Sequence, residues 1–241
     1  MKNVSGSTAE EARLIKAIQA AVGAVQDGSI GTQTLSDVAC RLNAGCFPLN
    51  LTIYGNPVII ARDALPAAVK APLSNYANAI SGSFNNGSAP CSILVADGKA
   101  VHEVACHYWD EKKPESVLYR LNSGVFGAKR VTSVRELPDG VKWAIGGMGL
   151  LGLYQPAAEG FSGRFADVLR KTAHTFAGVK NGMIYLGYVQ NMTALQVNNY
   201  VKKLGLEMAV MLDGGHFAAI NAKEDKKNTA QRQYYIVQGV R

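Results

Sequence analysis

The spacing of apolar and polar residues predicts a β-rich main body that begins near residue 49. Apolar positions alternate along residues 49–62, which is typical of two short strands joined by a turn at Gly55. Three later pairs of apolar runs flank residues that favour tight turns, so each pair is predicted to form a hairpin. These pairs are 91–96 with 99–109, 131–137 with 141–145, and 172–179 with 183–189. Residues 64–90 have few large apolar side chains and are predicted to be mostly loop, with one short helix.

Two capping boxes predict the starts of two helices. Thr8 stands three residues before Glu11, and Thr193 stands three residues before Gln196, so each pair can cap a helix reciprocally. After Thr8 the apolar residues recur every four positions, and a second short helix is predicted after the turn at 27–28. The two N-terminal helices are too short to be stable alone, so they must pack on another surface.

The C-terminal third has the order strand, helix, strand. The apolar run 208–212 follows the helix that begins after Thr193, and this order predicts a crossover unit whose two strands are parallel. The second of these strands ends in Asp213, Gly214 and Gly215. Because ligand sites in such sheets lie at the carboxyl ends of the strands, Asp213 is the first candidate for chemistry.

These elements predict an α+β fold. It consists of a mixed, largely antiparallel β-sheet with flanking helices, one βαβ crossover near the C-terminus and a small N-terminal helical segment. The predicted division places the helical segment at residues 1–46 and the main domain at residues 47–241. A chain of 241 residues can bury a sizeable core, so its folding requires neither a metal nor a disulfide.

Composition excludes several classes of protein. The chain is 48% hydrophobic and 18% charged, which excludes a disordered polypeptide. Its longest apolar stretch, 143–154, is shorter than the roughly 20 residues that a membrane helix needs. The first residues lack the features of a secretory signal, so we expect no membrane association and a protein that is cytoplasmic at synthesis.

Charge and cysteine content narrow the choice of partner. The net charge of +7 favours an anionic partner, such as a phosphorylated glycan, an anionic metabolite or nucleic acid. The basic residues form only scattered pairs without a dense stripe, which argues against nucleic acid. Cysteines stand at positions 40, 46, 91 and 106 without a CxxC pair, so we expect reduced, buried thiols rather than a zinc site.

Residues 15–35 resemble the peptidoglycan-binding helical module. The signature of that module is a glutamine-containing helix followed by D-G-x-x-G-x-x-T. The matching residues are Gln19, Asp27, Gly28, Gly31 and Thr34. The resemblance implies that this segment binds peptidoglycan, and the alternative is a helical cap that only covers an edge of the main sheet.

From about residue 50 to its end, the chain resembles the phosphodiester glycosidase (uncovering-enzyme-like) family. The resemblance rests on an ordered set of short motifs that recur along the family's domain. They are residues 79–84, AISGSF, for the family's AINxGFF; Lys171-Thr172-Ala173 for (R/K)TA; residues 181–186, NGMIYL, for (D/N)G-x-(I/V)-Y-L; residues 212–215 for LDGG; and Arg232 for a late arginine before the last strand. The resemblance implies hydrolysis of a glycosyl phosphodiester, either of the N-acetylglucosamine-1-phosphate type or in a cell-wall glycopolymer.

The resemblance also implies roles for individual residues. Asp213 would act as general base or nucleophile, or would hold sugar hydroxyls. His174 and His216 would donate to phosphate or shuttle a proton. Lys171 and Arg232 would neutralise the phosphate charge. The rest of the expected substrate-binding set, including glycines whose backbone N–H groups can approach a phosphate, is Thr172, Ser81, Gly82, Ser83, Gly214 and Gly215.

Other interpretations of the same residues stay open. An aspartate before two glycines is often only a turn former, and a single histidine is often structural. Asp213 with His174 and His216 is also a zinc-compatible set, although no His-x-His spacing supports it. We therefore expect no cofactor, with a bound divalent cation as the alternative.

Three departures from the family pattern keep two further functions open. Ser81 stands where the family has asparagine, His216-Phe217 where it often has Gly-Ser, and Lys171 where it has arginine. These changes would suit a non-catalytic binding protein for a phosphorylated sugar or nucleotide. The chain length, the N-terminal segment and the missing signal would suit a structural protein of phage origin, located in a phage particle or released to the cell wall.

Overall fold

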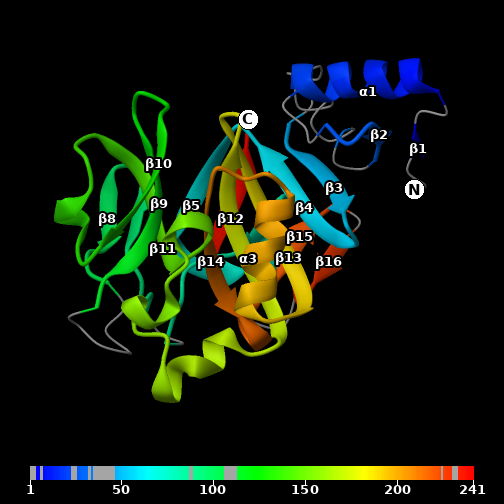
Figure 1. Ribbon diagram of the computed structural model, residues 1–241. Coiled ribbons are helices and arrows are strands. Elements are labelled where there is room, and N and C mark those ends of the chain that lie inside the picture. Colours follow the sequence, from blue (N-terminus) through cyan, green and yellow to red (C-terminus); the bar gives the residue numbers. More distant parts are fainter. Residues whose placement is uncertain are drawn as a thin grey trace.

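The computed structural model describes residues 4–5, 8–22, 26–31, 34, 47–86, 89–105, 113–223, 225–229 and 233–241. Two β-sheets and the helix α3 (Ala194–Lys203) form the main body (Figure 1). A smaller unit at its edge contains the helix α1 (Ala9–Val22) and the two-stranded sheet of β1 (Val4–Ser5) and β2 (Ser29–Ile30). No helix in the described part of the chain is long and apolar enough to cross a membrane.

The larger sheet has ten strands, and its main path runs β10-β9-β11-β14-β12-β13-β4-β3, with β7 and β8 attached to β11. Its strands are β3 (Leu49–Ile53), β4 (Asn56–Ala61), β7 (Leu94–Ala96), β8 (Lys99–His102), β9 (Glu115–Leu121), β10 (Phe126–Val131), β11 (Val141–Gly149), β12 (Thr172–Lys180), β13 (Met183–Met192) and β14 (Met208–Gly214).

The smaller sheet has five strands in the order β16-β15-β6-β17-β5. Its strands are β5 (Asp63–Pro72), β6 (Ala79–Ser81), β15 (Ile220–Ala222), β16 (Asp225–Lys227) and β17 (Gln233–Val240). Short 3₁₀ turns connect the strands at Leu73–Asn75, Val134–Glu136, Leu151–Leu153, Pro156–Glu159, Gly163–Leu169 and Gly215–Phe217.

The structure corrects the prediction of a mixed sheet. β13, α3 and β14 form the predicted crossover, and both strands run antiparallel to β12 and therefore parallel to each other. β12 lies between them, however, so they form no parallel ladder, and every strand pair among the described residues is antiparallel. The protein is mostly antiparallel β-sheet with few helices, which is richer in strand than the predicted α+β class implies.

Three of the predicted hairpins are present, and one is not. β3–β4, β7–β8 and β12–β13 pair as predicted, and the left-handed Asn181 (φ 52°) and Gly182 (φ 68°) form the two-residue turn of the last. The prediction for 131–145 is wrong, because β11 pairs with β9, and β10 is the outer partner of β9.

The predicted loop at 64–90 is also wrong in part. β5 covers Asp63–Pro72 and pairs with β17, and β6 pairs with β15 and β17. This segment contains small alanines and few large apolar residues, so its sequence shows no alternating pattern that would predict a strand. Its residues form strands because they pair with the C-terminal strand, which is a long-range contact that local propensity does not contain.

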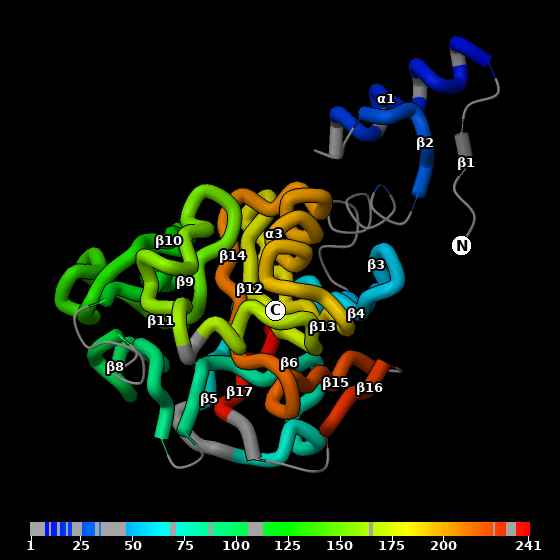
Figure 2. The backbone as a smooth tube through the Cα atoms, turned by 60° about the horizontal axis from the view of Figure 1, so that its bottom comes forward, coloured from blue at the N-terminus to red at the C-terminus, as the bar shows by residue number. Residues whose placement is uncertain are grey.

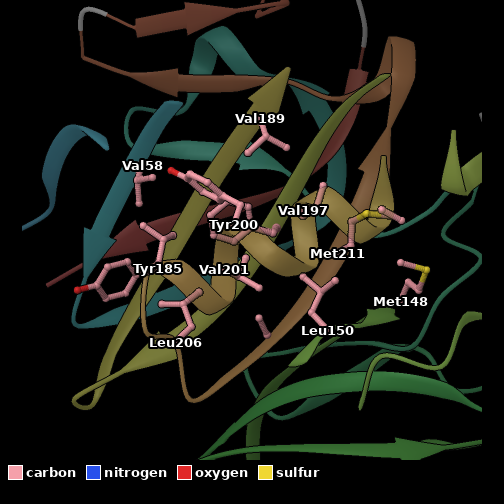
Figure 3. Close-up of a cluster of buried hydrophobic side chains, with 14 of the residues drawn as sticks. Val58, Met148, Leu150, Tyr185, Val189, Val197, Tyr200, Val201, Leu206 and Met211 are labelled. Atoms are coloured by element: carbon pink, nitrogen blue, oxygen red, sulfur yellow. The ribbon is translucent and has the colours of Figure 1, made fainter. Parts of the chain in front are cut away.

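Strands at the centre of the larger sheet bury both faces, which explains their continuous apolar runs. In β14, Ala209 and Met211 pack toward α3, whereas Val210 and Leu212 pack toward the five-stranded sheet. α3 and the five-stranded sheet thus lie on opposite sides of the ten-stranded sheet (Figure 2). Figure 3 shows the α3 side, where Tyr200 and neighbouring apolar side chains of the helix meet the strands.

The N-terminal unit is held together by the residues of its signature. The Gln19 side-chain amide donates to Asp27 Oδ1 at 2.7 Å and to Thr34 Oγ1 at 3.0 Å, and its oxygen accepts from the Gly28 N–H at 3.0 Å. The Thr8–Glu11 capping box forms as predicted. These signature residues thus stabilise the local fold, and the predicted second helix lies outside the described residues except for Thr34.

Candidate active site at the end of β14

The main chain of Asp213 is anchored by both sheets. Its N–H donates to the Gly82 carbonyl at 3.1 Å, next to β6. Its carbonyl accepts from the Thr175 hydroxyl of β12 at 3.0 Å, and the same hydroxyl lies 3.0 Å from the Ser81 carbonyl. β14, the strand that the apolar pattern predicted, therefore holds Asp213 at a fixed position where the two sheets meet.

The carboxyl group of Asp213 is buried among neutral donors. Oδ2 accepts from the Asn85 side-chain amide at 3.0 Å, and Oδ1 accepts from the Gly214 N–H at 2.9 Å. The residue is 9% exposed, and no ion pair of the described residues includes it. Burial raises the pKa of Asp213 to about 7, although the Gly214 and Asn85 hydrogen bonds act in the opposite direction. A carboxyl group of this kind exchanges a proton near neutral pH.

His174 lies against the turn that follows Asp213. Its Nε2 lies 2.9 Å from the Met192 carbonyl and 3.2 Å from the Arg170 carbonyl, so Nε2 carries a hydrogen and donates it. Nδ1 has no hydrogen-bond partner among the described residues, and a Cβ added to Gly214 would lie 2.9 Å from it. Burial lowers the pKa of His174, so the ring is neutral at neutral pH. The structure thus brings His174 beside the turn, with Nε2 committed to the backbone.

The segment Ser81, Gly82 and Ser83 lies beside the Asp213 main chain, and most of its polar groups serve the fold. Ser81 Oγ accepts from the Ala219 N–H at 3.0 Å. The Gly82 N–H donates to the Tyr235 carbonyl at 2.7 Å, so it is not open to a phosphate. Ser83 is 2% exposed, and its Oγ has no partner within the described ranges.

The remaining predicted site residues lie on the outer side of the turn or outside the described chain. Lys171 and His216 are exposed, whereas Thr172 and Gly214 are half-buried. Gly215 is also half-buried and has a left-handed φ of 60°, a conformation that favours glycine. Arg232 lies outside the described residues.

Arg170 reaches the glycine turn from the end of the 3₁₀ segment Gly163–Leu169. A Cβ added to Gly215 would lie 3.1 Å from Arg170 Nη2. Nη1 of the same guanidinium donates to Asp167, to Oδ2 at 2.9 Å and to the carbonyl at 3.1 Å. The arginine is 52% exposed at its side chain, so its charge faces solvent beside the turn.

The candidate metal ligands do not assemble. Within the described residues, no group of three histidine, cysteine, aspartate or glutamate side chains could hold a metal ion. His216 is exposed, and the Nε2 of His174 is occupied by carbonyl oxygens. Asp213, His174 and His216 therefore form no three-ligand group within the part of the chain that the structure describes.

A family model for phosphodiester glycosidases matches residues 74–236, more than half of the chain. The chain belongs to the phosphodiester glycosidase family. This match confirms the resemblance that the motifs around residues 79–84, 171–173 and 212–215 had indicated. It contains Asp213 and every structural partner of that residue described above.

One solved structure shows the same fold. The catalytic domain of zebrafish N-acetylglucosamine-1-phosphodiester alpha-N-acetylglucosaminidase, auto-inhibited by its pro-peptide, matches with a TM-score of 0.57 and 14% identity, over 81% of this chain and 82% of that one. A hypothetical protein from Synechocystis matches with a TM-score of 0.49 and 13% identity, over 79% of this chain and 61% of that one. A comparison with curated proteins found none similar in sequence to this chain.

The motifs of the phosphodiester glycosidase family did not reveal two polar residues beside Asp213 and its turn, or the buried Glu115 of β9. Asn85 follows the AISGSF motif but carried no expected role, although its amide binds Asp213. The (R/K)TA motif predicts a role for Lys171 and none for the preceding Arg170. Only the adjacent pair of basic residues indicates that Arg170 could also act. Glu115 begins β9, is 2% exposed, and accepts from the Ile93 N–H beside Gly146. No local pattern could have found Glu115, because its burial depends on contacts between distant strands.

Proposed function

We propose that this protein hydrolyses a glycosyl phosphodiester, with Asp213 as the general base. The observation that carries the proposal is the buried carboxyl group of Asp213, whose pKa is raised to about 7 in a domain of the phosphodiester glycosidase family. Burial without an ion pair to any described residue makes this carboxylate a stronger base than an exposed aspartate, yet a substantial fraction stays ionised at neutral pH.

The proposed reaction needs a base more than an acid. Water attacks the anomeric carbon, the bond from that carbon to the phosphate oxygen breaks, and the phosphate monoester leaves with the electron pair. The proton of the attacking water passes to the Asp213 carboxylate. A phosphate ester anion is a good leaving group, so this step requires no strong acid at the leaving oxygen.

The hydrogen bonds of Asp213 support this role. The carboxylate accepts from the Asn85 side-chain amide at Oδ2, from the Gly214 N–H at Oδ1 and from the Asn85 backbone N–H, and all three donors are neutral. These bonds fix the orientation of the group without neutralising it. Holding a base at a fixed position is one of the larger contributions to catalysis.

Two substrate classes are the first to examine. The zebrafish protein is named for an N-acetylglucosamine-1-phosphodiester, which makes sugar-1-phosphate diesters of that type the first class. A cell-wall glycopolymer linkage is the second, because the N-terminal unit resembles a peptidoglycan-binding module. Binding of peptidoglycan by residues 1–46 is part of the same proposal, and it would raise the local concentration of such a polymer.

The test is incubation with UDP-N-acetylglucosamine and a panel of sugar-1-phosphate diesters, with detection of free sugar. We expect release of sugar by the unaltered protein and its loss in Asp213→Asn, which keeps the shape of the side chain. Turnover that survives in Asp213→Asn would overturn the role of Asp213.

Non-catalytic binding of a phosphorylated sugar is the second candidate function. Ser81 supports it, because its hydroxyl holds the Ala219 backbone in the position where the family has asparagine. Stoichiometric binding of a sugar phosphate without any product would favour this second function over hydrolysis.

A further inference from the structure

We infer that Arg170, rather than Lys171, supplies the positive charge that binds the phosphate of the substrate. This inference rests on the proposed function, because it assigns the phosphate side of the same site. The (R/K)TA motif places the expected cation at Lys171. The geometry of the turn after Asp213 points to the residue before it.

The first observation is the position of the guanidinium. Arg170 Nη2 lies so close to Gly215 that an added Cβ would be 3.1 Å away. Gly215 is two residues from Asp213 in a turn that begins at the end of β14. The guanidinium therefore lies over the turn that carries the proposed base.

The second observation is that hydrogen bonds hold one terminal nitrogen of this guanidinium, whereas the other terminal nitrogen can still donate to a ligand. Nη1 is bound to Asp167, whereas Nη2 has no hydrogen-bond partner among the residues that the structure describes. The main chain of Arg170 is also fixed, because its carbonyl accepts from His174 Nε2 at 3.2 Å and its N–H donates to the Asp167 carbonyl at 3.1 Å. An arginine oriented in this way loses less side-chain entropy when it binds an anion.

The third observation is the contrast with Lys171. Both residues carry the same charge and both are exposed, but Lys171 has no ion pair or hydrogen bond within the described ranges. A guanidinium presents parallel N–H donors that match two phosphate oxygens, whereas an ammonium group acts as a point charge.

The surroundings of Asp213 explain why the positive charge of Arg170 would bind the phosphate rather than pair with the base. In the part of the chain that the structure describes, no cation donates a hydrogen bond to the carboxyl group, so the group keeps its basicity. Arg170 lies beside Gly215 and forms its ion pair with Asp167 rather than with Asp213, so it can bind the departing phosphate without compensating the charge of the base. Arg170 thus separates binding of the leaving group from activation of water.

The experiment measures binding by the full chain with isothermal titration calorimetry. The ligands are inorganic phosphate, N-acetylglucosamine 1-phosphate and free N-acetylglucosamine. In Arg170→Ala we expect binding of both phosphate ligands to weaken about tenfold or more, as for a lost charge-assisted hydrogen bond. Binding of the free sugar should not change. Thermal unfolding checks that the variant is folded, which we expect for a half-exposed side chain.

Lys171→Ala is the matched control, because it removes the same charge from the adjacent residue. We expect it to weaken phosphate binding by less than about threefold, as for an exposed charge without a direct contact. Arg170→Lys should fall between the two, since it keeps the charge and loses the paired donors. Equal losses in Arg170→Ala and Lys171→Ala, or no loss in Arg170→Ala, would overturn the inference.

The outcomes also separate this inference from the proposed function. Sugar release that is as fast in Arg170→Ala as in the unaltered protein refutes the role of Arg170 and leaves hydrolysis in place. Phosphate binding that depends on Arg170, without any sugar release, refutes hydrolysis and supports the inference. Failure of the unaltered protein to bind any phosphate ligand would refute both.

Discussion

Two aspartates of this protein are buried to a similar degree, but their pKa values are shifted in opposite directions. Asp63 is 4% exposed and Asp213 is 9% exposed. Asp63 accepts from Lys142 Nζ at 2.7 Å and Trp143 Nε1 at 2.7 Å, and it forms an ion pair with Arg120. Burial alone would raise the pKa of Asp63, but the bonds from Lys142 and Trp143 and the charge of Arg120 outweigh it, and the pKa is lowered.

The comparison teaches that burial alone does not mark a functional carboxyl group. Asp63 lies between cations that join β5 to β9 and β11, so its charge is compensated and it acts as a structural contact. Among the described residues Asp213 has only the neutral donors Asn85 and Gly214, so its charge is not compensated there and its pKa rises to about 7. The hydrogen-bond and ion-pair partners of a buried carboxyl group, rather than its extent of burial, distinguish a functional carboxyl group from a structural one.

The largest effect is expected from removing the charge of Asp213. Asp213→Asn should lower kcat for sugar release by about 100- to 10,000-fold, the usual contribution of a general base. The same variant should unfold at a higher temperature, because it no longer buries an uncompensated acid. Steady-state kinetics and calorimetry would measure the two effects. If Asp213→Asn is both active and less stable, Asp213 is a structural residue like Asp63 and not a general base.

The reverse result is expected for Asp63. Asp63→Asn removes one partner of a buried ion-pair network, so it should lower the free energy of unfolding by about 3 kcal/mol. Activity per folded molecule should change little, since the network lies on β5, β9 and β11 rather than at the end of β14. Urea titration and an assay below the unfolding transition would check this. Loss of activity in a fully folded Asp63→Asn protein would break the distinction.

The pH dependence sharpens the same comparison. If Asp213 is the base, kcat/KM should rise with pH and level off above its pKa of about 7, and this rise should vanish in Asp213→Asn. Because the folded pKa of Asp213 lies above its ordinary value of 3.8, this group lowers stability as pH rises from 3.8 to about 7.

Asp63 should contribute with the opposite sign. Its folded pKa lies below the ordinary value of 3.8, so it adds stability above that pH, and this stability is lost as pH falls through the lower folded pKa. Unfolding measured between pH 3 and 8 for each Asn variant would separate the two contributions. Matching pH profiles for both variants would contradict the comparison.

Glu159 should give the smallest effect, because it is an intermediate case. It is 1% exposed, and burial raises its pKa even though Arg130 lies 3.2 Å away and Ser116 and the Gly149 N–H donate to it. Glu159→Gln keeps one oxygen, which can accept from the Gly149 N–H, and its NH2 group can donate to the Ser116 hydroxyl, so stability should change by only about 1 kcal/mol. Urea unfolding would measure this. A loss above about 3 kcal/mol would show that the Arg130 charge pair dominates.

The sequence predicted the parts of this protein that depend on local pattern. The capping box at Thr193, the Asn181-Gly182 turn and the strand that ends at Asp213 were all visible, because each depends on neighbouring residues. The strand β5 and the pairing of β9 with β11 were not visible, because they are fixed by contacts with distant segments.

The same limit applies to the candidate site. The motifs predicted Asp213, His174 and Gly215, and the structure places His174 beside the turn that contains Gly215, since all three belong to conspicuous short patterns. The motifs could not choose between Arg170 and Lys171, because the direction of a side chain before a strand depends on the packing of the preceding 3₁₀ segment. The burial that raises the pKa of Asp213 is likewise a property of the assembled sheets.

The double anchoring of the Asp213 main chain has a consequence for redesign. Gly82 and Thr175 fasten this peptide to strands of both sheets, whereas the amide that covers the carboxyl group comes from Asn85 on a connecting segment. The reactive group and its cover can therefore be altered separately. A library that randomises Asn85 would change the cover of the carboxyl group while the acid keeps its place in the scaffold.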